Sequence, residues 1–382
     1  MIFLHLADLH LGKSVNGFSM LAEQRHAFAQ IINCIQEHRP DAVIIAGDIY
    51  DRAAPGVEAV RLLDDFLTEL AAENVALLLI SGNHDSPERL GYAGRLLAEK
   101  SIHLCGVFDG TLRSVAFEDE HGPVLIWLLP FIKPAAVRGF YDRREIESYD
   151  DALTAALGSA EIDQSVRNVL VSHQFYMKSG VTPERSESEL NPVGGLDAMN
   201  ADLISGFDYA ALGHLHGAQR VGGDHVRYAG SPVKYSFSEW RQQKSVTLVT
   251  LGEKGSVTVT ALPLTPLHDM REIKGPLEQL IRADIAWQAD REDYLRVILT
   301  DEEEIIDAMG KLRTAYPNVM ALSYENARSR VDIAAIAADA ESVEVLSPYE
   351  LFSNFFLEAS GAAMTQEQAA LACELLETEA AQ

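Results

Sequence analysis

The sequence is poor in cysteine, and its three cysteines, Cys34, Cys105 and Cys373, stand far apart in apolar surroundings. A disulfide framework uses an even set of cysteines, and a structural zinc site uses closely spaced ones, so both are excluded. The pattern predicts reduced thiols in a cytoplasmic protein.

Long apolar runs are also missing. The longest fall far short of the ~20 residues that a membrane span needs. The first eight residues, MIFLHLAD, contain no basic residue before the first acid, so no signal peptide is predicted and no membrane partner is expected.

Basic residues are scarce toward the C-terminus, and the net charge of the 382-residue chain is −26. Residues 331–382 hold ten acidic residues and no Lys or Arg. A protein that binds nucleic acid alone usually has a basic face, and this tail excludes itself from such contact. It is either a solvated, solubilising surface or a contact for a basic partner.

Apolar runs alternate with helical periodicity in the first half of the chain. Such alternation predicts a parallel-type sheet sandwiched between layers. Buried strands are predicted at residues 2–7, 42–46, 76–80, 168–171 and 209–212, and helices at 21–38, 57–72 and 88–97. Further strands are predicted at 111–117, 123–129, 226–229, 245–251 and 256–262. The long polar loop 178–195 favours a functional role.

The chain is long enough for several domains. Two prolines within residues 263–269 mark a boundary, after which strands and helices alternate in a short unit. We predict a main domain at residues 1–268, a small α+β domain at 269–326, a linker at 327–348 and a helical hairpin at 349–382.

The hairpin begins at a good helix start, with Ser347 as N-cap, Pro348 in the first turn and Glu350 three residues after the cap. An apolar stripe follows, made of Leu351, Phe352, Phe355 and Phe356. So small a hairpin cannot bury these side chains by itself. They dock either on the parent domain or on another protein, and both interpretations stay open.

Polar side chains gather where the predicted strands end. They are Asp8, His10, Asp48, Asn83, His173, His214 and His216. In an extended segment, residues i and i+2 point the same way, so the two D-x-H and H-x-H pairs can each present two ligands to one place. Nitrogen and oxygen donors without thiolates favour ions such as Mn²⁺ over structural zinc. A pair of ions needs a bridging carboxylate, and Asp48, central in chain order, is favoured over Asp8.

A single histidine at a strand end is more often an ordinary polar residue than a metal ligand. We apply that interpretation to His5, His26, His38, His103, His121, His225 and His268. The other histidines recur together with carboxylates at five successive strand ends, and this joint pattern predicts a metal centre.

The motif series resembles the calcineurin-like metallophosphoesterase superfamily over residues 1 to about 265. The motifs are D8-x-H10, G47-D48-x-x-D51-R52, G82-N83-H84-D85, S172-H173 and G213-H214-x-H216. Longer stretches at 171–175, 192–197, 209–216 and 228–239 are similar to a bacterial DNA-nuclease branch, and this likeness spans essentially the whole chain. The resemblance implies an α/β fold: a β-sandwich flanked by helices, with a small α+β capping domain and a C-terminal helical hairpin.

The resemblance also implies residue roles. One metal would be held by Asp8, His10, Asp48 and His216, and the second by Asp48, Asn83, His173 and His214. His84 would be a catalytic imidazole that binds no metal. Asp51 stands where many relatives carry histidine. In the phosphatase branch an acid there pairs with the catalytic histidine, so Asp51 is expected to orient His84 and raise its pKa. Arg52 would face a phosphate oxygen.

The function implied is a DNA nuclease that uses two Mn²⁺ ions, with Mg²⁺ or another divalent ion as an alternative. It would act as a double-strand 3′–5′ exonuclease and as an endonuclease on single strands and hairpins. An SMC-like ATPase partner would bind the C-terminal helices, and the chain would form a homodimer within a heterotetramer. DNA would meet Lys178, Arg185, Lys234 and Arg241.

Two alternatives remain at this point. The first is a metallophosphoesterase acting on small phosphodiesters or phosphoproteins, which shares the ligands but leaves the cap and tail unexplained. The second is a scaffold without catalysis, and the complete ligand set counts against it.

Overall fold

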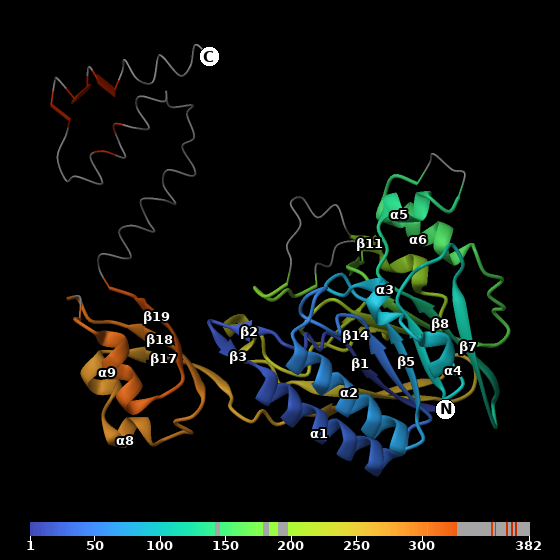
Figure 1. Ribbon diagram of the computed structural model, residues 1–382, viewed down its shortest axis with the longest axis horizontal. Helices are drawn as coiled ribbons and strands as arrows, with labels where there is room; N and C mark the ends of the chain where they lie inside the picture. Colours follow the sequence, from blue (N-terminus) through green and yellow to red (C-terminus); the bar gives the residue numbers. More distant parts are fainter. Residues whose placement is uncertain are drawn as a thin grey trace.

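Two six-stranded mixed sheets, flanked by helices, form the main body, and a smaller three-stranded sheet lies beside it (Figure 1). The computed structural model describes residues 1–141, 146–178, 183–189, 198–303 and 305–326, and eight positions beyond residue 350. The arrangement confirms the predicted α/β sandwich with an additional C-terminal capping region.

The first sheet has the spatial order β16-β15-β1-β4-β5-β6. Strands β1, β4, β5 and β6 run parallel, as their short apolar sequences and intervening helices predict, and β15 and β16 are antiparallel additions. Their bounds are β1 Ile2–Leu6, β4 Ala42–Ala46, β5 Ala76–Ile80, β6 Ile102–Cys105, β15 Ser245–Leu251 and β16 Val257–Pro263.

The second sheet has the order β13-β14-β12-β9-β8-β7. Its central strands β14, β12, β9 and β8 are parallel, while β13 and β7 pair antiparallel at its edges. Their bounds are β7 Arg113–Asp119, β8 Gly122–Leu129, β9 Arg167–His173, β12 Tyr209–Gly213, β13 Gln219–Val221 and β14 Gly223–Tyr228.

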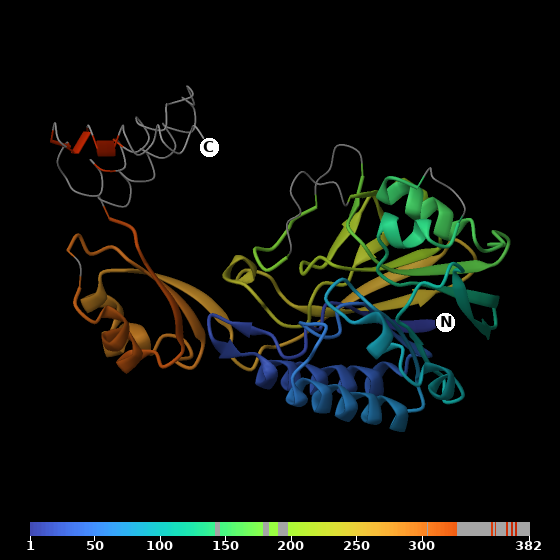
Figure 2. The same cartoon turned by 45° about the horizontal axis from the view of Figure 1, so that its top comes forward.

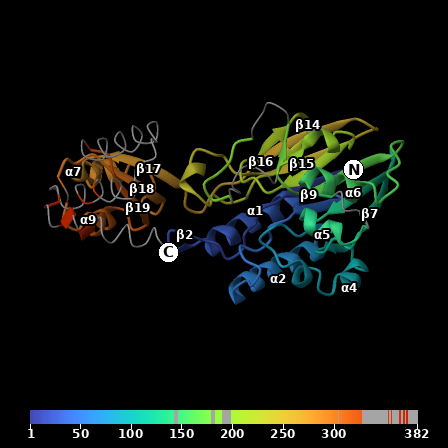
Figure 3. The same cartoon turned by 90° about the horizontal axis from the view of Figure 1, so that it is seen from above.

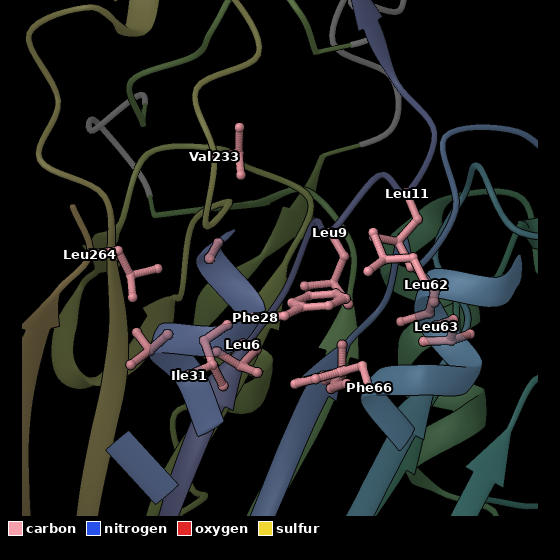
Figure 4. Packing of buried hydrophobic residues seen from close by; sticks show 14 of the residues in the cluster. Leu6, Leu9, Leu11, Phe28, Ile31, Leu62, Leu63, Phe66, Val233 and Leu264 are labelled. Atoms are coloured by element: carbon pink, nitrogen blue, oxygen red, sulfur yellow. The ribbon is translucent and has the colours of Figure 1, made fainter. Parts of the chain in front are cut away.

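Helices cover the outer face of each sheet. The helices α1 (Leu21–His38) and α2 (Val57–Ala72) cover the first sheet, and α5 (Pro134–Arg138) and α6 (Tyr149–Leu157) belong to the core of the second (Figure 3). Phe28 of α1 stacks on Phe66 of α2 with ring centroids 4.0 Å apart (Figure 4). Each buried side chain of this size contributes about 1.5–3 kcal/mol.

Two of these features differ from the sequence prediction. The helix expected at 88–97 is two short helices, α3 (Pro87–Leu90) and α4 (Gly94–Ala98), and the helices α5 and α6 were not predicted. The smaller elements are β2 Ser14–Val15, β3 Phe18–Ser19, β10 Tyr176–Met177, β11 Met199–Asn200, and the 3₁₀ turns η2 Ala201–Ile204 and η3 Phe237–Glu239.

The capping region holds the third sheet, drawn in orange in Figure 2. Its strands β17 (Met270–Gly275), β18 (Tyr294–Leu299) and β19 (Val319–Tyr324) run parallel, because helices link each strand to the next. We predicted an α+β unit there; the strand directions are those of an α/β unit. The helices are α7 Leu277–Leu280, α8 Ala283–Ala286 and α9 Ala308–Ala315, the last shorter than the predicted 302–315.

A buried carboxylate joins the capping region to the sandwich. Glu23 of α1 accepts hydrogen bonds from the backbone N–H groups of Leu267 and His268, at 3.1 and 3.2 Å, and lies 2.7 Å from the His268 ring. Lys234 pairs with Asp269 at 2.6 Å across the same junction. Within the described part of the chain, no helix is both long and apolar enough to cross a membrane.

Candidate metal centre

The seven predicted ligands lie together where strand ends of the two sheets meet. Asp8, Asp48 and Asn83 follow β1, β4 and β5 of the first sheet. His173 ends β9, and His214 follows β12 of the second sheet. The carboxyl ends of parallel strands share one sheet edge, so the sequence order of the motifs becomes a single cluster in space.

Four members of this cluster adopt the left-handed backbone region, namely Asp8 (φ 54°), His10 (φ 43°), Asp48 (φ 51°) and His214 (φ 110°). This conformation is strained for residues with a side chain and gathers at functional sites. Backbone bonds hold it here: the His10 N–H donates to the Asp48 carbonyl at 2.9 Å, and the Asp8 N–H to the Gly47 carbonyl at 3.1 Å. The backbone is therefore shaped to direct these side chains inward.

Two glycines allow the loops to approach each other closely. A Cβ atom added to Gly82 would lie 2.1 Å from Oδ1 of Asp48, and one added to Gly47 would lie 2.4 Å from Nδ1 of His173. Both distances are too short for any side chain. The glycines of the G-D and G-N-H-D motifs are thus required by the packing of the ligands themselves.

His10 and His216 form one half of the cluster. Their Nε2 atoms lie 3.0 Å apart, and His10 Nε2 is 3.6 Å from Oδ2 of Asp48. Both rings are buried, and His10 Nδ1 has no hydrogen-bond partner among the described residues. Buried ring nitrogens that converge in this way are suited to a shared cation.

Asn83, His173 and His214 form the other half. Oδ1 of Asn83 lies 3.1 Å from His173 Nε2 and 3.1 Å from His214 Nδ1. The same Asp48 Oδ2 that faces His10 is 3.3 Å from His173 Nε2. Asp48 therefore lies between the two halves, while the Asp8 carboxylate accepts the His214 N–H at 2.9 Å.

Burial and the two carboxylates divide the protonation states of the cluster. Burial lowers the pKa of His10 and His216, and lowers that of His214 to about 3. Burial acts the same way on His173, but Asp48 outweighs it and raises the pKa of His173 to about 9. Burial raises the pKa of Asp8, whereas His173 holds that of Asp48 well below its usual range despite burial. Three of the four imidazoles are thus neutral near pH 7, with nitrogen lone pairs available.

The donor set fits divalent cations. Three subsets, namely Asp8 with His10 and His216, His10 with Asp48 and His84, and Asp8 with Asp48 and His173, each have ligand atoms within 4.8 Å of one another. Imidazole, amide and carboxylate groups without thiolate suit hard-to-borderline ions. Two buried carboxylates close together also require positive charge, which the surrounding histidines supply only in part.

His84 lies beside these groups, with its ring centroid 4.8 Å from that of His10. Its N–H donates to Asp48 Oδ1, and its Nδ1 lies 2.9 Å from the backbone carbonyl oxygen of Asp51. We expected the Asp51 carboxylate to make this contact. That carboxylate instead pairs with Lys13 at 2.8 Å, because Lys13 on the neighbouring loop offers a full charge. The partner of His84 is thus the Asp51 main chain.

Asp85 is a further residue of the site that we did not single out. Its buried carboxylate accepts N–H bonds from Ile49, Tyr50 and Gly82, at 3.0, 2.9 and 2.9 Å. Burial raises the pKa of Asp85 to about 6. Because these N–H groups belong to the loops after β4 and β5, Asp85 ties together the loops that carry Asp48 and Asn83. Its place in the G-N-H-D motif was the available signal.

The predicted basic contacts differ in their surroundings. Arg52 is 83% exposed, 3.6 Å from Asp51. Arg185 lies over the Phe175 ring, 3.6 Å from its centroid, and Arg241 lies over the Trp240 ring. Lys178 is 3.8 Å from Asp202 and remains half exposed.

Lys234 is different, because its side chain is only 10% exposed and its ammonium group bonds to the Trp240 carbonyl and to Asp269. This geometry fits a structural contact at the junction with the capping region better than a contact with DNA. Of the apolar stripe, Leu351, Phe352 and Phe355 lie outside the described residues, whereas Phe356 is a half-buried helical residue.

Comparison with known proteins matches the same two parts of the chain. Residues 1–218 match the family "calcineurin-like phosphoesterase", and residues 266–360 match "type 5 capsule protein repressor C-terminal domain", the SbcD C-terminal family. The SbcD component of the nuclease SbcCD from Staphylococcus epidermidis is 32% identical over 326 residues, 85% of each chain. Its counterpart from Staphylococcus saprophyticus is 30% identical over 374 residues, 96% of each chain.

The chain belongs to the SbcD family. SbcD proteins are metallophosphoesterases, so this chain is a hydrolase of phosphoester bonds with a dimetal site of histidine and aspartate residues. A solved dimetal phosphatase from Danio rerio aligns with 69% of this chain and 98% of its own at 11% identity, with a TM-score of 0.39.

Proposed function

We propose that this SbcD chain is the Mn²⁺-dependent nuclease component of a DNA-processing complex, which degrades double-stranded ends 3′ to 5′ and cuts single strands and hairpins. Its biological setting would be DNA repair, recombination and replication-linked hairpin processing. The observation that carries the proposal is the convergence of His10, Asp48, Asn83, His173 and His216 at the meeting point of two sheets.

The contacts support a division of the ligands into two sets that share Asp48. Asp8, His10, Asp48 and His216 would hold one ion, and Asp48, Asn83, His173 and His214 the other. A single oxygen, Asp48 Oδ2, lies within 3.6 Å of both His10 and His173. This position favours Asp48 over Asp8 as the bridging carboxylate. When bound, the two ions supply Lewis-acid contact to a phosphate and make water acidic enough to act as a nucleophile.

His84 is proposed to act on the reacting phosphate without binding metal. The Asp51 carbonyl accepts a hydrogen bond from Nδ1 in both the neutral and the cationic ring, so Nε2 is the atom left to exchange a proton. An imidazole so placed can protonate the leaving oxygen or stabilise charge in the transition state. Lys13 neutralises the Asp51 carboxylate and so keeps that negative charge from the incoming phosphate.

DNA is the proposed substrate, and the exposed cations near the site are the proposed contacts. Arg52, Lys178, Arg185 and Arg241 remain in this set, while Lys234 is engaged internally. Few cations and a net charge of −26 argue on electrostatic grounds against a strong grip on DNA by this chain alone. A partner that holds DNA answers this difficulty.

That partner is proposed to be an SbcC-type, SMC-like ATPase, as the name of the relatives suggests. The acidic C-terminal segment and the stripe Leu351, Phe352, Phe355 and Phe356 would dock on it. A homodimer of this chain within a heterotetramer is part of the same proposal. Co-purification with the ATPase and measurement of the mass of the complex test it.

The decisive experiment uses the purified chain and end-labelled linear duplex DNA. We expect cleavage with Mn²⁺, weaker cleavage with Mg²⁺ and none with a chelator. A hairpin oligonucleotide and a chromogenic small phosphodiester are run in parallel. Hydrolysis of the small ester with no cleavage of any DNA, with or without the ATPase, would refute the nuclease proposal and favour a small-molecule phosphodiesterase.

A further inference from the structure

A buried ion pair lies directly behind His216, on the side of the ring opposite His10. Glu239 is fully buried and Lys244 nearly so, and Lys244 Nζ lies 2.6 Å from Oε2 of the glutamate. Lys244 also donates to the His216 carbonyl at 2.9 Å and the Ser231 hydroxyl at 3.0 Å. Burying two charges is costly unless every donor and acceptor is satisfied, so a satisfied pair at this place calls for a functional reason.

The other carboxylate oxygen, Oε1, faces His216 and two serines. It lies 3.2 Å from His216 Nδ1, 2.8 Å from the Ser188 hydroxyl and 2.7 Å from the Ser186 hydroxyl. The Ser188 hydroxyl is in turn 2.8 Å from His216 Nδ1. An ionised carboxylate can only accept, so the serine hydroxyls donate to it. Nothing next to Nδ1 is then left to donate, and Nδ1 itself must carry the proton.

We propose that Glu239 is a positioning residue that holds His216 in the tautomer with a proton on Nδ1, so that Nε2 presents its lone pair to the dimetal site. The Nε2 atom is the one that lies 3.0 Å from His10 Nε2. Carboxylates behind metal-binding histidines act in this way and make the ring a stronger ligand. The proposal rests on the proposed assignment of His216 as a ligand.

The same carboxylate fixes the segment 183–189. Besides the two serine contacts, Glu189 accepts the His216 N–H at 2.7 Å. This segment belongs to the long polar loop that also carries Arg185, a proposed DNA contact. Glu239 therefore connects that loop with one half of the dimetal site, and its loss should affect His216 far more than the half built on His173 and His214.

The first test reads the tautomer without metal. Metal-free protein labelled with ¹⁵N in its histidine rings gives the protonation of each nitrogen, with the His216 signals assigned by their absence in His216→Gln. We expect Nδ1 of His216 to be protonated and Nε2 not. Glu239→Gln should shift both signals toward a mixture of tautomers, because its amide can either donate or accept. Glu187→Gln, an exposed carboxylate of the same segment, is the matched control and should leave the signals unchanged.

The second test measures Mn²⁺ by calorimetry in the unaltered protein, Glu239→Gln and Glu187→Gln. Carboxylates behind a metal ligand change metal affinity by about 10- to 100-fold, so Glu239→Gln should weaken one of two binding steps by that factor and leave the other nearly unchanged. Unchanged ring signals together with unchanged affinity at both steps would overturn the proposal and leave Glu239 a purely structural residue.

Two further variants keep the test decisive. If Glu239→Gln does not fold, Glu239→Gln with Lys244→Met removes both charges together and is measured in the same way. Ser188→Ala asks whether the serine alone holds the ring: retention of the Nδ1–H tautomer supports Glu239, and its complete loss assigns the role to Ser188 instead. If no form binds Mn²⁺, including the unaltered protein, the ligand assignment fails, while the tautomer measurement still judges the contact with Glu239.

Discussion

The two ends of the sandwich treat buried carboxylates in opposite ways. At the end away from the dimetal site, the carboxylate of Asp119 pairs with the Arg167 guanidinium, which also donates to the Gly252 carbonyl at 2.9 Å. Nearby, Asp208 lies 2.8 Å from Lys254 Nζ and accepts the Asn168 N–H at 2.7 Å. Each acid at this end has a permanent cation of the protein beside it.

At the other end, Asp8 and Asp48 face imidazoles and N–H groups. Their backbone is left-handed, whereas the opposite end is built on regular strand starts. The difference shows which charges the fold neutralises by itself and which it leaves for bound ions. One end thus contributes mainly stability, and the other mainly chemistry, and substitutions at the two ends should separate these properties.

The largest effect is expected from Asp48→Ala. The change removes the one oxygen that faces both His10 and His173, and so removes the bridge between the two halves. Calorimetry should find no binuclear Mn²⁺ binding, and DNA cleavage should fall below detection. Two bound Mn²⁺ in this variant would show that the bridge is a different group, with Asp8 the first candidate.

His84→Ala should separate catalysis from metal binding within the same end. Because the ring contacts the Asp51 carbonyl and is proposed to act on the phosphate, its loss should lower the cleavage rate by about 10²- to 10⁴-fold. Mn²⁺ stoichiometry should stay at two. A variant that binds no Mn²⁺ would turn His84 into a ligand and refute the role given to it.

At the opposite end, Asp119→Asn should lower stability and leave Mn²⁺ binding unchanged. The hydrogen bonds from Arg167 hold the pKa of Asp119 well below its ordinary value of 3.8, so this stabilisation is complete above pH 4 and is lost as pH falls through the lowered pKa. Leaving Arg167 buried without its partner should cost about 3 kcal/mol at pH 7.

Denaturant unfolding of the metal-free proteins at pH 7 and pH 3 checks this prediction. The difference in unfolding free energy between the two proteins should shrink at pH 3, because the carboxyl of the unaltered protein then begins to take up its proton. Carboxylates of the metal end titrate equally in both proteins and cancel. A difference that grows toward low pH would contradict the assigned sign.

The sequence was informative where local pattern and chemistry coincide. The strands before Asp8, Asp48 and Asn83 are short apolar runs, and the ligands follow them at fixed motif positions, so their convergence could be predicted. The glycines of these motifs could be located too, although the contact of Gly82 with Asp48 needs the third dimension.

Other features depend on contacts between distant segments and have no local signature. The carboxylate of Asp51 lies as close in sequence to His84 as its own carbonyl does, and only the position of Lys13 decides which group meets the ring. The pairing of Glu239 with Ser186 and Ser188 joins segments about fifty residues apart. Lys234 looked like a surface cation until Asp269 was placed beside it.

The smallest effect on both ends of the sandwich is expected from truncation after Ser347. The contacts that build the dimetal site and the Asp119–Arg167 pair all lie within residues 1–264, so Mn²⁺ binding and cleavage of simple DNA should persist. Association with the ATPase should be lost, together with any stimulation by ATP. Phe352→Ala with Phe356→Ala should reproduce the loss at full chain length, because two large apolar side chains contribute about 3–6 kcal/mol, or roughly 10²- to 10⁴-fold in affinity. If the truncated chain no longer melts cooperatively, the phenylalanines belong to this protein's own core, and the docking proposal fails.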